Sequence, residues 1–228
     1  MIIPNKYDMS KEENIFIAKR ILVDSVYQQA NLEGIGVTFS ETQDILNNIN
    51  VGTLTPTDIS KVCCLRDGWE YLLSNIDNPT DLIFIENLHE IVARFDVPYQ
   101  YLGKLREDEV IISVTKWRPE IPDADKLFHK MSAAADPSHM TNDALELGLW
   151  LMRCQPFKDG NKRIGSFVIN KILIENGCGI FNVPVQLDGK FKQYLVDFYE
   201  SNDTDFLKQW IFDNCLEGTH EINSLEKL

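Results

Sequence analysis

The sequence has no long hydrophobic run, no signal-peptide-like start and no excess of positive charge. No stretch approaches the roughly 18 apolar residues of a membrane span, so we expect no membrane segment. The start, MIIPNKYDMSKEEN, lacks the apolar core of a signal peptide, and we expect a cytoplasmic protein. The 22 basic and 35 acidic residues give a formal net charge of −13. Such a field repels phosphate polyanions, which argues against nucleic acid as the main partner.

Cysteines are few and scattered. There are five, and only Cys63 and Cys64 lie close together in the sequence. No CxxC pair or histidine-rich tract accompanies them, so a structural zinc site is unsupported. We expect reduced, buried thiols.

Helical periodicity is what the 228 residues do contain, and with 44% hydrophobic and 25% charged residues the chain lies in the globular range. The run Val110–Thr115 is the exception, because its β-branched residues predict one strand of a short hairpin. The sequence therefore predicts an all-α bundle with one small β-hairpin. Helices are expected over 11–33 as one helix of about five turns, after Ser40, from 56, from 80, and over 123–134, 141–154, 161–176, 189–200 and 204–215.

The turn between the two most apolar helices, Gln155–Arg163 (QPFKDGNKR), is unusually polar. Phe157 is an apolar anchor for this turn. Asp159 and Gly160 open the second helix, whose first amides lack intrahelical acceptors and lie at the positive end of the helix dipole. Because Gly160 has no side chain to block an approach, the turn can form an anion-binding nest.

Charged residues of the same turn fit a phosphate ligand. Lys162 and Arg163 bring positive charge, and Asp159 could coordinate Mg²⁺ beside a bound diphosphate. The spacing leaves an alternative open, in which Asp159 only caps the helix, Gly160 makes the turn, and Lys162 and Arg163 are solvated.

The turn resembles the active-site signature of the Fic (Fido) family, His-x-Phe-x-Asp/Glu-Gly-Asn-x-Arg-x-x-Arg. Segments at 31–34, 102–106, 110–115 and 198–203 are similar too, so the likeness covers about residues 25–218. The resemblance implies a Fic-like helical bundle in which 1–55 is an N-terminal extension with an inhibitory-helix-like segment, 56–218 is the core domain and 219–228 is a tail. The matching signature positions are Phe157, Asp159, Gly160, Asn161 and Arg163.

By this resemblance the protein transfers AMP from ATP to a hydroxyl side chain of a target protein. Asp159 would hold Mg²⁺, the amides of 160–162 would cradle the phosphates and Arg163 would neutralise their charge. A flap would hold an extended target segment by strand addition. The oligomeric state stays open, with a homodimer as one possibility. The resemblance assigns nucleotide binding to Phe157, Gly160, Asn161, Lys162, Arg163 and Ser166, and the flap to Val110, Ile111, Ile112, Ser113 and Val114.

Three positions depart from the family pattern. Gln155 replaces the histidine that acts as general base, and a neutral amide cannot accept a proton near pH 7. Ser166 replaces the second arginine of the pattern, and a serine brings no charge to the γ-phosphate. Lys162 replaces a common glycine, as in the kinase-like branch of the family. None of the four histidines offers a substitute base, and His89, on an apolar helix face, is expected to be a core histidine.

Glu33 takes the place of the family's inhibitory glutamate. In the family that glutamate pairs with the second arginine, a position that Ser166 occupies in this sequence. Glu33 therefore either contacts Lys162 or Arg163 or is only a helix-terminal residue. Three functions stay open. They are a nucleotide-binding protein with weak or lost AMP transfer, a non-catalytic protein-interaction module, and a transferase of altered chemistry such as phosphoryl transfer.

Overall fold

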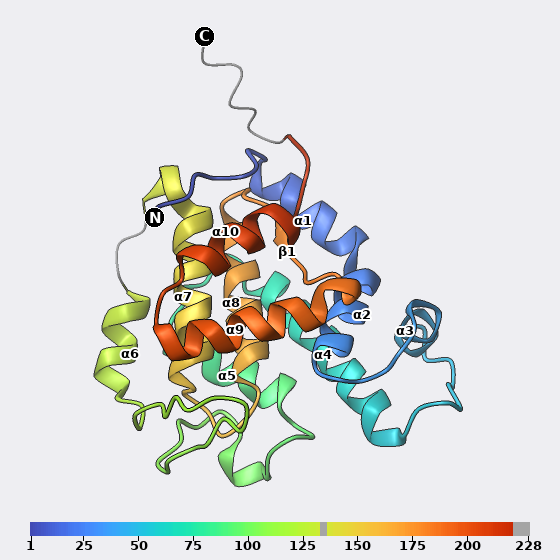
Figure 1. Ribbon diagram of the computed structural model, residues 1–228. Coiled ribbons are helices and arrows are strands. Elements are labelled where there is room, and N and C mark those ends of the chain that lie inside the picture. The colour runs from blue at the N-terminus through green and yellow to red at the C-terminus, as the bar shows by residue number, and fades with distance from the viewer. Residues whose placement is uncertain (133–135, 221–228) are drawn as a thin grey trace.

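Ten α-helices and two short strands form the regular structure of residues 1–132 and 136–220, the part of the chain that this computed structural model describes (Figure 1). The strands β1 (Ile180–Phe181) and β2 (Leu216–Glu217) pair antiparallel. This confirms the predicted all-α fold, whereas the small sheet takes the place of the β-hairpin that was expected near Val110–Thr115. The helices are α1 (Lys11–Arg20), α2 (Leu22–Leu32), α3 (Phe39–Leu46), α4 (Pro56–Ser74), α5 (Leu82–Val92), α6 (Ala124–Met131), α7 (Met140–Cys154), α8 (Asn161–Glu175), α9 (Asp188–Ser201) and α10 (Asp205–Asn214).

Helices α7 and α8 lie side by side at the centre of the molecule (Figure 1). Two glycines allow their close approach. A Cβ atom on Gly148 would lie 2.7 Å from the Gly165 carbonyl oxygen, and one on Gly165 would lie 2.5 Å from the Gly148 carbonyl oxygen. The turn that joins the two helices is therefore held between rigid, closely packed elements.

The hydrophobic core lies on both sides of α8. On one side Phe167 packs edge-on against Trp69 of α4, within a cluster that includes α2 and α5. On the other side Ile169 and Leu173 belong to a cluster with α7, α9 and α10, where Phe191 is fully buried. Because α8 is enclosed in this way, its amino end has a fixed position.

Local capping signals set several helix starts. Ser10 and Thr38 each form a reciprocal capping box, with Glu13 and Glu41 respectively. The expected start of α3 after Ser40 was therefore late, because the Thr38 cap begins the helix at Phe39.

The single helix expected over 11–33 was wrong, because the helix breaks at Ile21. Beyond the break, α2 turns polar side chains toward the interior. Ser25 accepts a hydrogen bond from Asn182 (3.0 Å), and Gln29 accepts one from the indole of Trp69 (3.0 Å). Apolar periodicity carries no information on such buried polar contacts.

The strand expected at Val110–Thr115 was also wrong in its position. These residues form an irregular loop, in which the Thr115 amide donates to the Ile112 carbonyl oxygen (3.1 Å) across a turn. The side chains of Ile111 and Val114 are 73% and 68% exposed. A β-branched run forms a strand only where a partner strand exists, and among the described residues this loop has none, although Ile112 packs against the core.

All five cysteines are free, as expected, and Cys64, Cys178 and Cys215 are buried. Burial raises the pKa of Cys178 to about 11 and that of Cys215 to about 12. Within 1–132 and 136–220, none of the helices combines the length and hydrophobicity that crossing a bilayer requires. The end of the helix expected over 123–134 and most of the expected tail, from 221 onward, lie outside the described residues.

Candidate functional site

The turn between α7 and α8 begins and ends in left-handed backbone conformations. Gln155 ends α7 with φ 50° and ψ 62°, and Gly160 precedes α8 with φ 76°. The first is uncommon for a residue with a side chain, whereas glycine adopts the second without steric cost. These two residues reverse the chain tightly and leave the amino end of α8 open.

Asn161 and Phe157 hold the turn from inside. The Phe157 amide donates to Asn161 Oδ1 (2.8 Å), and Asn161 Nδ2 donates to the Phe157 carbonyl oxygen (2.8 Å) and to Gln155 Oε1 (2.9 Å). Phe157 is fully buried and does not line a cleft, so the structure makes it the anchor that the sequence predicted.

His89 supports the turn from α5. Its ring stacks on Phe157, with centroids 4.0 Å apart. Nδ1 accepts a hydrogen bond from the Gly103 amide (3.0 Å), so Nε2 carries the proton and donates to the Asp159 carbonyl oxygen (3.1 Å). Burial lowers the pKa of His89 to about 4. The residue is a neutral core histidine, as expected, and is not available as a base.

A cleft of about 640 Å³ opens at the amino end of α8. The amides of Asn161, Lys162 and Arg163 have no acceptor inside the helix, and no side chain caps this end. The cleft therefore combines free backbone donors with the positive end of a helix dipole. It is lined by Glu33, Ile112, Val114, Gln155, Asp159, Gly160, Asn161, Lys162, Gly189, Lys192, Gln193, Leu195, Val196 and Tyr199.

Glu33 reaches the site from the end of α2. One carboxylate oxygen lies 3.2 Å from Lys162 Nζ and the other lies 3.3 Å from Arg163 Nε. Lys162 also donates to the Leu32 carbonyl oxygen (2.9 Å). Of the two alternatives that the sequence left open for Glu33, the structure thus shows the contact with Lys162 and Arg163.

Arg163 does not line the cleft. Its buried guanidinium donates to Asp96 and to the Val92 carbonyl oxygen, and it borders a neighbouring pocket of about 250 Å³. Burial opposes its charge, but the carboxylates of Glu33 and Asp96 outweigh burial and raise the pKa of Arg163. Lys162 is therefore the signature cation that faces the cleft.

The side chain of Gln155 is already engaged. Nε2 donates to the Met152 carbonyl oxygen (2.6 Å), and Oε1 accepts from Asn161. Tyr199, from α9, lines the same wall, and burial raises the pKa of its hydroxyl further above neutral pH. The described residues that line the cleft include no histidine.

Ser166 and most of the flap lie away from the cleft. Ser166 is 3% exposed, and its Oγ finds no hydrogen-bond partner among the described residues. Of the flap residues, Ile112 and Val114 line the cleft, whereas Val110, Ile111 and Ser113 do not.

Sequence reasoning missed the contribution of α9. Lys192 and Gln193 line the cleft from α9, and Lys192 pairs with Asp188 (2.8 Å). No local pattern marks these residues, because only the packing of α9 across the bundle brings them to the site.

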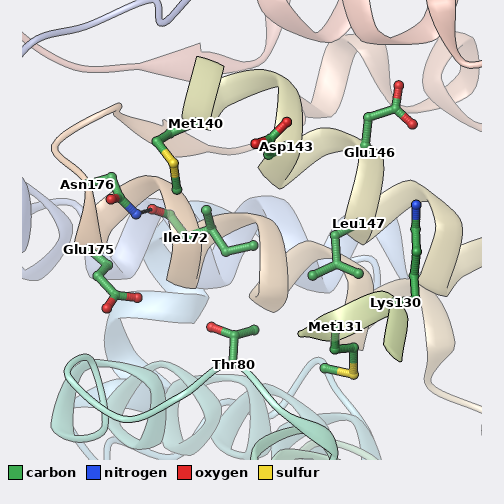
Figure 2. A pocket seen from close by; sticks show the side chains of 10 residues that line it. All are labelled: Thr80, Lys130, Met131, Met140, Asp143, Glu146, Leu147, Ile172, Glu175 and Asn176. Atoms are coloured by element: carbon green, nitrogen blue, oxygen red, sulfur yellow. Dashed lines mark hydrogen bonds between the residues drawn. The ribbon is translucent and has the colours of Figure 1, made fainter. Parts of the chain in front are cut away.

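A second pocket, of about 380 Å³, lies between α6, α7 and α8 (Figure 2). It contains none of the predicted site residues. Two of its three carboxylates have basic partners, since Glu146 pairs with Lys208, and Glu175 with Lys171 (3.0 Å). The cleft at α8 is therefore the stronger candidate.

Comparison with known proteins agrees with this geometry. The model of the Fic/DOC family matches residues 79–173, from just before α5 to near the end of α8. The matched segment, which contains the turn at Gln155–Arg163, is similar to the Fic/DOC family. No curated protein matches it.

Solved structures share the fold. A variant of Fic-1 from C. elegans superposes with a TM-score of 0.71 at 16% identity, covering 87% of this chain and 63% of its own. A Fic-domain-containing signaling protein from Bacteroides thetaiotaomicron gives a TM-score of 0.68 at 17% identity, and the match covers 90% of this chain and 88% of that protein. A Fic family protein from Desulfovibrio desulfuricans gives a TM-score of 0.65 at 16% identity, and the match covers 89% of this chain and 63% of that protein. The chain thus spans less than two thirds of the first and third of these proteins.

Proposed function

We propose that this protein binds ATP in the cleft at the amino end of α8, and that its transfer of AMP to target proteins is weak or lost. Members of the Fic fold family commonly transfer AMP or other nucleotide groups to proteins, and they typically use ATP. The observation that carries the proposal is the uncapped end of α8, which faces a cleft beside Asp159 and Lys162.

The phosphate-binding part rests on three kinds of donor. The free amides at 161–163 suit phosphate oxygens, Gly160 permits a close approach, and Lys162 supplies charge. The role assigned to Arg163 by the family pattern moves to Lys162 in this proposal, because Asp96 and Glu33 hold Arg163 outside the cleft.

Asp159 suits a Mg²⁺ ion that arrives with the nucleotide. Its side chain is 60% exposed at the cleft, and Oδ1 accepts from the Gly160 amide (2.6 Å). The described residues contain no cluster of three metal-ligating side chains. A single carboxylate fits Mg²⁺ that is held mainly by phosphate oxygens and water. Bound there, the ion would neutralise phosphate charge.

The transfer step itself lacks a base. The hydroxyl oxygen of the target would bond to the α-phosphorus, the bond to the β-phosphate oxygen would break, and pyrophosphate would leave. The hydroxyl proton must also be removed. Gln155 cannot accept it, and losing a positioned base costs about 10²–10⁴ in rate.

One observation favours the alternative of a non-catalytic interaction module. The Gln155 amide bonds to Met152 and Asn161, which makes it a structural part of the turn. In both proposals the flap residues Val110–Val114 dock a segment of a protein partner, because Ile112 and Val114 border the cleft and the apolar side chains of Ile111 and Val114 are exposed.

The test uses ATP labelled at the α-phosphate or at the γ-phosphate, with Mg²⁺ and the protein itself as acceptor. It compares the unaltered protein with Gln155→His and with Gln155→Asn, which keeps a neutral amide. Each is made with and without Glu33→Gln. We expect little α-label transfer by the unaltered protein, a gain of about 100-fold with histidine, and none with asparagine.

Each outcome separates the candidates. If Gln155→His binds ATP but gains no transfer, the missing base is not what limits the protein, and the interaction module is supported. Transfer of the γ-label would instead assign phosphoryl transfer. Absence of ATP binding in every variant would refute the proposed function.

A further inference from the structure

Arg106 is a buried arginine in the segment that leads into the flap. Its side chain is 2% exposed, and no carboxylate among the described residues lies within ion-pair distance of it. Burial lowers the pKa of this guanidinium. Burying a charge without a counter-ion costs free energy unless nearby dipoles stabilise it. The hydrogen bonds of Arg106 therefore indicate its role.

All of its side-chain bonds go to main-chain carbonyl oxygens. Nε donates to Gln155 (2.6 Å), Nη1 to Asp108 (2.7 Å) and Nη2 to Glu120, with longer contacts from Nη2 to Pro119 (3.3 Å) and Cys154 (3.4 Å). These acceptors come from three segments, namely the two ends of the flap and the end of α7.

Main-chain geometry reinforces the same junction. The Arg106 amide donates to the Pro156 carbonyl oxygen (3.0 Å), within the turn that carries the signature. The last carbonyl groups of α7 have no intrahelical donors, and a cation at a helix carboxyl end is favoured by the dipole. Arg106 thus satisfies the end of α7 and both ends of the flap with one planar group.

We infer that Arg106 is a positioning residue, which fixes the flap against the backbone of Gln155 and so sets the width of the cleft. The inference rests on the proposed function for its consequence, because the flap and Gln155 are the walls between which a target hydroxyl would meet a nucleotide. Lysine cannot take this role, since a single ammonium cannot match the spread of acceptors that the guanidinium fork reaches.

The test is amide hydrogen exchange on the unaltered protein and on Arg106→Lys. We expect exchange of 107–118 and 155–160 to rise together by about tenfold, while the interiors of α4 and α8 change less than about twofold. The matched control is Arg118→Lys, because within the described part of the chain Arg118 donates only to the carbonyl oxygens of Thr115 and Trp117 in its own loop. Loosening of only one segment, of neither, or of the whole protein equally would overturn the inference.

Kinetics supply a second readout. In the Gln155→His protein, Arg106→Lys should lower the rate of α-label transfer to the protein itself at saturating ATP about tenfold and leave the KM for ATP within about twofold. An unchanged rate, or an equal change in the KM for ATP, would contradict a positioning role. If Gln155→His transfers nothing, this kinetic readout is lost, but hydrogen exchange still decides the role of Arg106. Absence of ATP binding would refute the proposed function without changing the hydrogen-exchange result.

If Arg106→Lys does not fold, hydrogen exchange of the unaltered protein at increasing denaturant concentration tests the inference instead. The amides of Arg106 and Gln155 should then exchange through one opening event, with the same dependence on denaturant. Different dependences would show that the flap and the turn open separately, which would overturn the inference.

Discussion

The carboxylate of Glu33 occupies the part of the cleft nearest the amino end of α8. It is 19% exposed and lies close to Lys162 and Arg163. A triphosphate approaching this helix end would meet a negative charge and would compete for Lys162. At the scale of single residues, we propose that Glu33 opposes nucleotide binding, even though Ser166 stands where the family has the arginine that pairs with this glutamate.

Replacement of Glu33 by glutamine tests this role. Glu33→Gln should tighten the Kd for ATP with Mg²⁺ about tenfold, because one repulsive charge is removed and Lys162 is released. Isothermal titration calorimetry measures the change. The control is Glu12→Gln, an exposed carboxylate of α1. Equal affinity in Glu33→Gln and the unaltered protein would show that Glu33 only ends its helix.

At the scale of elements, the contact between α7 and α8 positions the signature turn. Gly165→Ala would place a Cβ 2.5 Å from the Gly148 carbonyl oxygen and 2.5 Å from Met152 Cγ. Alanine favours a helix, but a clash with backbone cannot be relieved by a change of rotamer. We expect a net loss of about 2 kcal/mol in the free energy of unfolding, measured with urea.

Gly189→Ala is the matched control for that substitution. Gly189 lies in α9, and nothing lies within 4 Å of a Cβ built there. The same change should therefore stabilise the protein by about 0.5–1 kcal/mol. A stabilising effect of Gly165→Ala would contradict the close packing of the two central helices.

Elements with local signals were predictable from the sequence, and elements that depend on distant partners were not. Apolar periodicity and capping residues such as Ser10 located the helices, and the turn at Gln155–Arg163 carries its own glycine and asparagine. The strand expected at 110–115 does not form, because no strand of the described residues pairs with it. The roles of Lys192, Gln193 and Arg106 were not predicted, because they arise only from contacts across the fold.

At the scale of the whole molecule, His89 makes the stability depend on pH. Its folded pKa of about 4 lies below the unfolded value of 6.5, so the unfolded chain binds a proton that the folded chain does not. Stability is therefore lost as pH falls from about 6.5 toward 4. Between pH 7 and pH 5 this loss is about 2 kcal/mol.

His89→Gln should be less stable at pH 7 and should lose about 2 kcal/mol less than the unaltered protein between pH 7 and pH 5. Urea unfolding followed by circular dichroism at both pH values measures the difference. His129, an exposed residue of α6, provides the control, and His129→Gln should keep the full loss. An unchanged pH dependence in His89→Gln would rule out His89 as its source.

Among residues 1–132 and 136–220, four basic side chains are almost completely enclosed, namely Arg106, Arg163, Lys171 and Lys208. They neutralise interior dipoles and partly buried carboxylates, so they contribute little to the potential felt outside. The exterior is correspondingly dominated by its carboxylates. In a crowded solution, proteins with a cationic acceptor region would collect around it, and dilute buffers would favour those encounters over concentrated salt.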